Sequence, residues 1–389
     1  MNNQSNFTLI KNGMLYDPRE RGRKDVLIGD ERILKIAEFI DVPENFETDV
    51  VDCSEKMIVP GLIDIHVHLT GGGGETGPHS RVPELPVSEI AEAGITTAVG
   101  TLGTDDVTRS VETLLAKAKG LNRHVTSYIY TGSYHLPSPN ITGSVKKDIA
   151  LIDEIIGVKI AISDHRSPQP TLSELKKLAS EARVGGMMGN KPGIVHLHVG
   201  SGKSGLKPIR EAVQGSEIPI SQFLPTHLGR SPRLIREGAD LVESGGFIDI
   251  TCPADSSNRE EVLEAITNIF KEKDLSLKNV TFSSDGNGSM PEFDEGGNLV
   301  GLTKGKVNTL HKTMVDFVRS GSLDLPDALS LFTTNPARRL GISDRKGSLE
   351  EGKDADVLIL SEDLEIEKGF AKGEQIVEDG KGVIEGPYE

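Results

Sequence analysis

The chain has little of what marks several large classes of protein. It contains no Trp, only 4% aromatic residues and only two cysteines among its 389 residues. The scarcity of aromatic residues excludes a stacking platform for single-stranded nucleic acid. Two cysteines cannot form a disulfide framework, and neither Cys53 nor Cys252 lies in a C-x-x-C motif. We therefore expect a reducing compartment such as the cytoplasm.

Positive charge and long hydrophobic runs are also scarce. Lys and Arg number 43 against 59 Asp and Glu, which gives a formal net charge of −16. Such an acidic chain disfavours electrostatic contact with nucleic acid or an anionic membrane. No apolar run approaches the ~20 residues that span a bilayer, and the first residues, MNNQSNFTLI, lack the order of a signal peptide. We expect a soluble, cytoplasmic protein with neither kind of partner.

The distribution of short strands and helices predicts two domains. Residues 1–58 and 345–389 show β-type residues split by turn formers, and we expect both termini to form one small β-sandwich-like domain. Residues 59–344 alternate apolar, β-branched runs with helical stretches, which predicts an α/β fold, a (β/α)₈ TIM-type barrel. The expected barrel strands are 63–69, 96–100, 127–134, 155–163, 194–200, 222–227, 247–251 and 280–285. The expected helices are 82–93, 107–119, 144–155, 171–182, 231–243, 259–271, 303–320 and 325–340.

Polar residues with metal-binding chemistry end several of these strands. A TIM barrel places its catalytic groups at the C-terminal ends of its strands. His66 and His68 end the first strand and, two residues apart, face the same way. Later strands end in His196 and His198, in His227, and in Asp285. Imidazole with carboxylate suits zinc or a similar ion, although periodicity does not decide which histidine of the fifth strand binds.

Lys159 lies inside the apolar run GVKIAI of the fourth strand. Burial favours the neutral amine. A neutral amine can add CO₂ to give a carbamate, an anion able to bridge two metal ions. A lysine in such a run is more often salt-bridged or extended to solvent, but the strand-end histidines and Asp285 favour the metal-binding interpretation.

This set of residues resembles the amidohydrolase superfamily of binuclear metallohydrolases. Longer motifs resemble one branch of it, the isoaspartyl (β-aspartyl) dipeptidase family, peptidase family M38. The motifs are HVHLTGGGGETGP at 66–78, TGSYHLPSPNITGSV at 131–145, GVKIAISDHRS at 157–167, LPTHLGR at 224–230 and SSDGNGSMPEFD at 283–294. They are spread along nearly the whole chain.

The resemblance implies two Zn²⁺ ions per subunit. The implied ligands are His66, His68 and Asp285 on one ion, His198 and His227 on the other, and a carboxylated Lys159 that bridges both. A metal-bridging hydroxide is the implied nucleophile. Asp285 is the implied proton shuttle, because a single carboxylate can accept the nucleophile's proton and deliver it to the leaving amine.

The resemblance also implies a small dipeptide substrate with an N-terminal β-linked aspartyl residue. Such a substrate carries one ammonium and two carboxylates, so its site needs one anion and two cations. The implied contacts are Gly73, Gly74, Glu75, Thr104, Tyr134, Arg166, Arg230 and Ser289. Among them Glu75 would accept the α-ammonium, and Arg230, with Thr104 and Ser289, would bind the isoaspartyl carboxylate. Arg166 would face the leaving residue, and Tyr134 would hydrogen-bond the substrate carbonyl oxygen.

Two other interpretations of the sequence stay open. The first is another binuclear amidohydrolase, such as a cyclic-amide hydrolase of the dihydroorotase or hydantoinase kind. Glu75 and the paired arginines argue against it, because a cyclic ureide has no free ammonium. The second is a non-catalytic relative, which would lack some of the metal ligands that are present here. The resemblance further implies a homo-oligomer, an octamer.

The sequence also gives expectations for a few residues outside this set. His165 could support the site from behind the metal ligands. Met187 and Met188 are expected to fill the core. Cys53 and Cys252 are expected to be small buried residues without a nucleophilic role, because no Cys/His pattern surrounds either of them.

Overall fold

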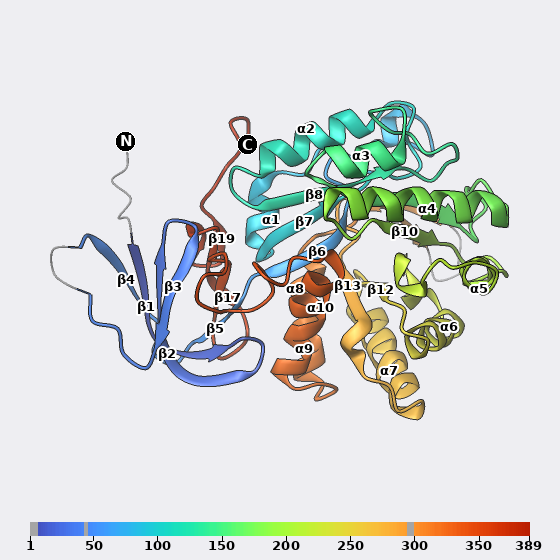
Figure 1. Ribbon diagram of the computed structural model, residues 1–389. Coiled ribbons are helices and arrows are strands. Elements are labelled where there is room, and N and C mark those ends of the chain that lie inside the picture. The colour runs from blue at the N-terminus through green and yellow to red at the C-terminus, as the bar shows by residue number, and fades with distance from the viewer. Residues whose placement is uncertain (1–6, 43–45, 294–298) are drawn as a thin grey trace.

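The structure, a computed structural model, describes residues 7–42, 46–293 and 299–389. It consists of a β-rich part built from both ends of the chain and a larger α/β part (Figure 1). In Figure 1 the β-rich part lies on the left and the α/β part on the right.

Strands from both termini form one mixed sheet. Its order is β19-β18-β17-β16-β5-β1-β2-β3, with β4 paired to β1. The two ends of the chain meet where β16 pairs antiparallel with β5, Val357 opposite Pro60. The sandwich-like domain expected from the sequence is thus a single continuous sheet. Its strands are β1 (Phe7–Tyr16), β2 (Glu20–Gly29), β3 (Arg32–Ala37), β4 (Thr48–Asp52), β5 (Met57–Pro60), β16 (Val357–Leu360), β17 (Ile366–Ala371), β18 (Glu374–Glu378) and β19 (Lys381–Gly382).

A buried ion cluster lies where the chain returns from the barrel to this sheet. The Lys346 side chain is only 1% exposed. Its Nζ lies 3.0 Å from Asp354 Oδ2 and 2.5 Å from Asp356 Oδ2. Asp354 also pairs with Arg345 and with Arg32 of β3. A charged lysine is rarely buried unless it is paired, so this cluster anchors the C-terminal segment on the sheet.

All eight predicted barrel strands are present. They are β6 (Leu62–Val67), β7 (Ile95–Gly100), β8 (Thr126–Gly132), β9 (Ile155–Ile162), β10 (Ile194–Val199), β11 (Phe223–Thr226), β12 (Ile248–Thr251) and β13 (Val280–Ser283). Strands β6 to β11 form a curled parallel sheet in sequence order, and β12 and β13 form a separate parallel pair. β12 lies beside β11, and β13 beside β6. Because helices cover the outer face, every residue of β6, β7, β9, β10 and β11 is buried, as near-continuous apolar runs predict.

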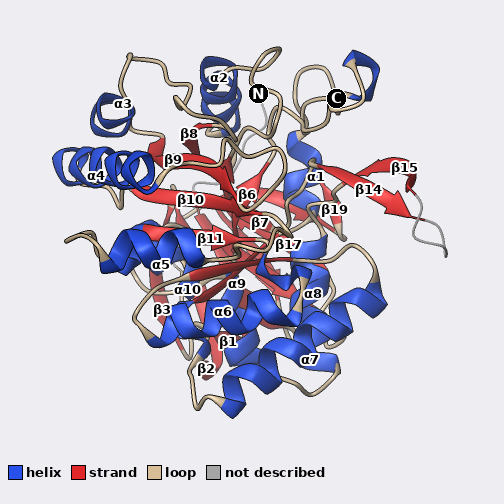
Figure 2. Cartoon of the chain, turned by 90° about the vertical axis from the view of Figure 1, so that its right-hand side faces the viewer, coloured by secondary structure: helices blue, strands red, loops and turns tan. Residues whose placement is uncertain are grey.

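The helices lie around the strands on the outside (Figure 2). They are α1 (Val87–Glu92), α2 (Val111–Leu121), α3 (Val145–Leu151), α4 (Leu172–Gly189), α5 (Lys207–Gln214), α6 (Pro232–Glu243), α7 (Ser256–Glu272), α8 (Thr309–Arg319), α9 (Leu325–Phe332) and α10 (Thr334–Leu340). The sequence analysis missed α5. α4 begins with a capping box, in which Thr171 and Glu174 satisfy each other's backbone N–H groups.

Two expectations from the sequence are wrong. The helix expected over 303–320 begins only at Thr309, because the preceding residues form β15 (Leu299–Lys304), which pairs antiparallel with β14 (Ser289–Phe293). This hairpin extends away from the barrel (Figure 2). Met187 and Met188, expected in the core, are 72% and 71% exposed near the end of α4. Cys53 and Cys252 are buried, as expected.

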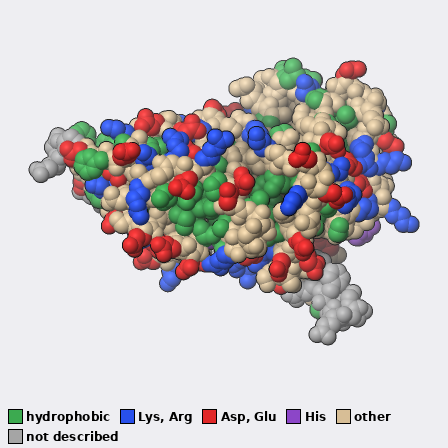
Figure 3. All heavy atoms as spheres, turned by 90° about the horizontal axis from the view of Figure 1, so that it is seen from below, with side chains coloured by type: hydrophobic (Ala, Val, Ile, Leu, Met, Phe, Trp, Pro, Cys, Tyr) green, Lys and Arg blue, Asp and Glu red, His purple; other side chains and the backbone are tan. Residues whose placement is uncertain are grey.

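The surface carries charge of both signs. Acidic and basic side chains are interspersed over the face shown in Figure 3, with hydrophobic side chains between them. Among the described helices, none has the length and apolar character needed to cross a membrane.

Candidate active site

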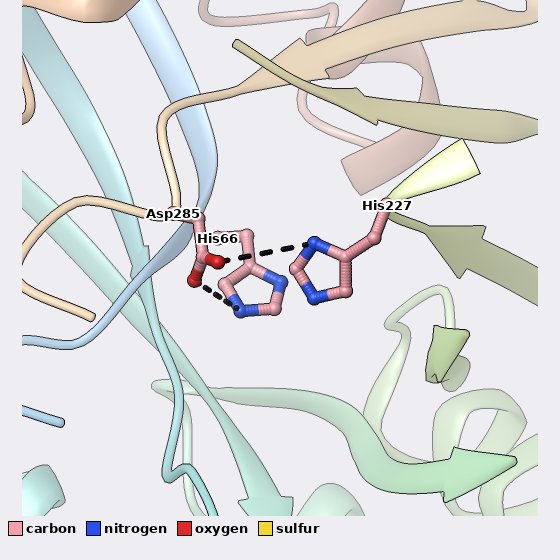
Figure 4. Close-up of side chains that lie close together, drawn as sticks. All are labelled: His66, His227 and Asp285. Carbon is pink, nitrogen blue, oxygen red and sulfur yellow. Dashed lines mark ion pairs between the residues drawn. The ribbon is translucent and has the colours of Figure 1, made fainter. Parts of the chain in front are cut away.

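The side chains predicted to bind metal converge at the C-terminal end of the barrel strands. His66, His227 and Asp285 point toward one another (Figure 4), and each offers a ligand atom within 4.8 Å of the others. The His66 ring centroid lies 5.4 Å from that of His68 and 5.0 Å from that of His227. The ring centroids of His198 and His227 are 4.5 Å apart. Side chains from the ends of four separate strands, β6, β10, β11 and β13, thus share one cluster.

Asp285 and Lys159 lie among these rings. Asp285 Oδ1 is 3.3 Å from His66 Nε2 and 3.1 Å from His68 Nε2, and Oδ2 is 3.9 Å from His227 Nδ1. Lys159 Nζ is 3.1 Å from His66 Nε2. Asp285 and His227 both adopt left-handed backbone angles, with φ of 51° and 66°. Such angles are uncommon for residues with side chains and concentrate at functional sites.

Burial sets the charges of these groups. It lowers the pKa of His66 and of His198 to about 3, and it lowers the pKa of His68 and His227 as well. Burial lowers the pKa of Lys159 to about 7. Against the effect of burial, the neighbouring histidines hold the pKa of Asp285 well below its ordinary value. Neutral imidazoles and an ionised carboxylate are the forms that bind metal ions.

The predicted substrate contacts lie around this cluster. Glu75 Oε1 is 3.7 Å from Arg166 Nη1, and the Arg166 guanidinium is 5.3 Å from the centre of the Tyr134 ring. A cavity of about 260 Å³ is lined by Gly73, Gly74, Glu75 and Thr104. A second cavity, of about 410 Å³, is lined by Arg230 together with His227 and Asp285. Ser289 begins β14, where its backbone packs against that of Gly72.

Tyr134 is placed to donate a hydrogen bond. It lies two residues beyond the end of β8 and is buried. Burial raises the pKa of its phenol above the ordinary value, so the hydroxyl keeps its proton. Its oxygen is 2.6 Å from His198 Nδ1, and its ring centre is 5.4 Å from Lys159 Nζ. The hydroxyl therefore points into the cluster.

The whole-chain comparisons agree with this geometry. The model of the amidohydrolase family matches residues 57–376. The chain belongs to the amidohydrolase family. It is 42% identical to the β-aspartyl dipeptidase of Fervidobacterium islandicum AW-1, solved in complex with a β-Asp-Leu dipeptide. That similarity covers 98% of each chain, with a TM-score of 0.90. The resemblance seen in the motifs is thereby confirmed, and the protein is a hydrolytic enzyme.

More distant amidohydrolases act on other substrates. A dihydroorotase of Streptococcus thermophilus is 24% identical over 91% of this chain and 90% of its own. A D-hydantoinase structure is 18% identical and covers 98% of this chain and 97% of its own, with a TM-score of 0.72. At that identity the hydantoinase shows the shared fold alone, which includes a TIM-type barrel.

The candidate metal-binding residues of this amidohydrolase have the chemistry to hold a borderline divalent ion. The donor set consists of imidazole nitrogens, a carboxylate and a buried amine, all ligand types or precursors suited to zinc. Among the described residues, Nδ1 of His68 is buried without a hydrogen-bond partner. A buried polar atom without a partner is costly. The other ring nitrogen, Nε2, lies 3.1 Å from Asp285 Oδ1, which is likewise buried without a hydrogen-bond partner. The structure thus offers a site for metal.

Two residues hold the ligands in place, and the sequence analysis gave neither of them this role; it named His196 only as a possible ligand and did not single out Asp164. Asp164 Oδ2 accepts a hydrogen bond from His198 Nε2 at 2.9 Å, which leaves Nδ1 as the acceptor of the ring, and in this structure the Tyr134 hydroxyl lies 2.6 Å from it. His196 Nε2 lies 2.8 Å from His66 Nδ1, and its ring stacks on Tyr130. The first histidine of the HLH motif and the first residue of DHR were the available signals in the sequence.

His165 does not occupy the place expected for it. Its side chain is 88% exposed, and its Nδ1 lies 3.4 Å from Asp164 Oδ1. Asp164, the preceding residue, turns inward instead and binds both His198 and Arg166. Because the chain bends sharply at Ser163, which has a positive φ of 55°, alternation along the strand no longer predicts which side chain faces the site.

Proposed function

We propose that this amidohydrolase is a zinc-dependent isoaspartyl (β-aspartyl) dipeptidase. It would hydrolyse the isopeptide bond of dipeptides with an N-terminal β-linked L-aspartyl residue. The observation that carries the proposal is one anion and two cations around the metal-ligand cluster: Glu75 beside Arg166, and Arg230 lining the cavity with His227 and Asp285. This matches the one ammonium and two carboxylates of the substrate. The similarity to a β-aspartyl dipeptidase solved with β-Asp-Leu supports it.

Two Zn²⁺ ions would be held by His66, His68, Lys159, His198, His227 and Asp285. Such ions supply Lewis acidity and lower the pKa of bound water to about 7. Lys159 would bridge them as a carbamate. Its neutral amine would attack the carbon of CO₂ and lose one proton, which gives a bidentate anion. A lysine whose pKa lies at about 7 offers a substantial neutral fraction for that addition.

The side chains of the protein would bind the substrate and move its protons. Glu75 would accept the α-ammonium, and Arg230, with Thr104 and Ser289, would bind the isoaspartyl carboxylate near Gly73 and Gly74. Arg166 would bind the carboxylate of the leaving residue with its planar fork. The Tyr134 hydroxyl would donate to the oxygen of the scissile carbonyl as charge develops there. Asp285 would accept a proton and deliver it to the leaving amine, which departs poorly unless it is protonated.

A cyclic-amide hydrolase is the second candidate, favoured by the match to dihydroorotases over most of the chain. The two candidates differ in what Glu75 binds, because a cyclic ureide offers no free ammonium. A hydrolysis screen of the purified enzyme, together with elemental metal analysis, separates them. The proposal expects bound zinc and cleavage of β-Asp-Leu, with neither α-Asp-Leu nor dihydroorotate hydrolysed at a comparable rate. Preferred turnover of dihydroorotate or hydantoin would reverse the assignment.

A further inference from the structure

The loop that carries Glu75 is held through its backbone. It leaves β6, turns through the glycine run and returns, with Gly72 O accepting a hydrogen bond from Val82 N at 2.9 Å. Gly71 and Gly73 have φ of 82° and 80°, and a side chain at either would collide with the backbone of the returning segment. A glycine-rich segment has few side chains with which to pack. Its position therefore depends on polar contacts to its carbonyl groups.

One buried guanidinium supplies those contacts. Arg109 Nε donates to Thr70 O at 2.9 Å, and Nη2 donates to Gly72 O at 3.1 Å and to Val82 O at 2.8 Å. Nη1 donates to Asp105 Oδ2 at 2.7 Å. Four of the five N–H groups of an arginine are thus used. Three of them contact the outgoing and returning arms of the loop, and the fourth contacts Asp105. The Arg109 side chain is only 4% exposed.

The same guanidinium joins two loops that carry predicted substrate contacts. Arg109 and Asp105 belong to the loop after β7, which also carries Thr104. Thr104, Asp105 and Glu75 line the same cavity of about 260 Å³. A lysine could not replace this arrangement, because its three donors originate from a single atom and cannot span carbonyls on opposite arms. The distance between Glu75 and Thr104 is therefore set through Arg109.

We propose that Arg109 is a positioning residue for recognition of the charged isoaspartyl half of the substrate. It does not contact substrate; it fixes the loop that presents Glu75 to the α-ammonium, relative to the loop that presents Thr104 to the neighbouring carboxylate. This inference rests on the proposed function. According to this inference, Arg109 lies outside the cluster of predicted metal ligands and yet determines the selectivity for a substrate that carries an ammonium group.

The test compares β-Asp-Leu with N-succinyl-Leu, which is the same molecule without its α-amine. The ratio of kcat/KM for β-Asp-Leu to kcat/KM for N-succinyl-Leu measures how much the contact between Glu75 and the α-ammonium contributes to catalysis. In Arg109→Lys this ratio should fall about tenfold or more, which is the loss of one charge-assisted hydrogen bond, while zinc content stays that of the wild type. Added guanidinium should restore part of the ratio in Arg109→Ala.

Arg259→Lys is the matched control. Arg259 is another buried arginine that donates to two loop carbonyls and a carboxylate, those of Pro253, Ala254 and Asp316. Its loop does not carry Glu75, so the variant should leave the ratio at its wild-type value. If Arg109→Lys does not fold, Asp105→Asn provides the same test, because it removes the carboxylate that holds Nη1.

The outcomes separate this inference from the proposed function. A wild-type enzyme with no preference for β-Asp-Leu over N-succinyl-Leu would overturn the proposed function, and the role of Arg109 with it. A preference that persists undiminished in Arg109→Lys and Asp105→Asn would overturn the role of Arg109 alone. An equal fall of the ratio in Arg259→Lys would show general loosening of the barrel loops and would also reject the assignment.

Discussion

Replacing Asp164 by Asn should weaken metal binding and substrate binding together. The Asp164 carboxylate accepts hydrogen bonds from His198 Nε2 at 2.9 Å and from Arg166 Nε and Nη2, both at 3.0 Å. Although burial opposes it, these bonds hold the pKa of Asp164 well below its ordinary value, so the group is an anion at neutral pH. Asparagine keeps one acceptor oxygen but turns an N–H donor toward His198 or Arg166.

The expected loss follows from those contacts. Outer partners of metal-binding histidines are typically worth about 10- to 100-fold in metal affinity or activity, and a hydrogen bond to a charged group contributes roughly 1.5–3 kcal/mol. We expect kcat/KM for β-Asp-Leu to fall by about 10- to 100-fold in Asp164→Asn. Zinc affinity, measured by competition with a chelator, should fall with it.

A second substrate divides the effect between the two partners of Asp164. β-Asp-Leu amide lacks the leaving-residue carboxylate that Arg166 would bind, so it reports only the contribution through His198. Asp240 lies on α6 and is a partly exposed partner of Lys273. Asp240→Asn therefore serves as the control, and it should change neither the zinc affinity nor kcat/KM. Unchanged zinc affinity and unchanged kcat/KM in Asp164→Asn would refute the reasoning that Asp164 orients His198 and Arg166.

Three further predictions test other parts of the molecule. Glu75→Gln should lower kcat/KM for β-Asp-Leu by about 10- to 100-fold and leave zinc content intact; full activity would contradict the specificity argument while sparing the metal site. Lys159→Ala should lose zinc or activity, with partial recovery on addition of short-chain carboxylic acids in place of the carbamate, and a fully active variant would exclude a bridging role. Lys346→Met should destabilise the protein to denaturant by about 3 kcal/mol, because it leaves the buried Asp356 carboxylate without its lysine partner and removes one of the cations around Asp354, whereas Lys207→Met, at an exposed pair on α5, should have no measurable effect. The pKa of Lys346 is raised and that of Asp354 lowered, so the difference between wild type and Lys346→Met should persist from about pH 5 to 9 and shrink as Asp354 protonates in acid.

The barrel strands could be predicted because most of them are buried on both faces and therefore read as nearly continuous apolar runs. The metal-ligand candidates followed from the same fact, since a polar residue such as His227 or Asp285 at the end of such a run is conspicuous. The hairpin β14–β15 could not be predicted in this way. Its residues interrupt the alternation of strand and helix, and the β-branched Thr303 was assigned to a helix that begins only six residues later.

The residues that hold the predicted ligands and the Glu75 loop in place could not be predicted from the sequence, for a different reason. Asp164 and His165 are neighbours in the chain, and only the turn at Ser163 decides that the first faces His198 while the second faces solvent. Arg109 lies in none of the sequence motifs that indicated the site. Its partners are backbone carbonyls of another loop, and a backbone carbonyl leaves no trace in the residue types of the sequence.

The linear chain by itself determined which residue types could bind metal and which strands carry them, because burial and side-chain chemistry are properties of each segment. Tertiary structure alone decided how those residues are held: which imidazole nitrogen of His198 contacts Asp164, which carboxylate faces Arg166, and which guanidinium keeps the Glu75 loop in place. These choices depend on hydrogen bonds between segments far apart in sequence. Such bonds exist only once the barrel has brought its loops together.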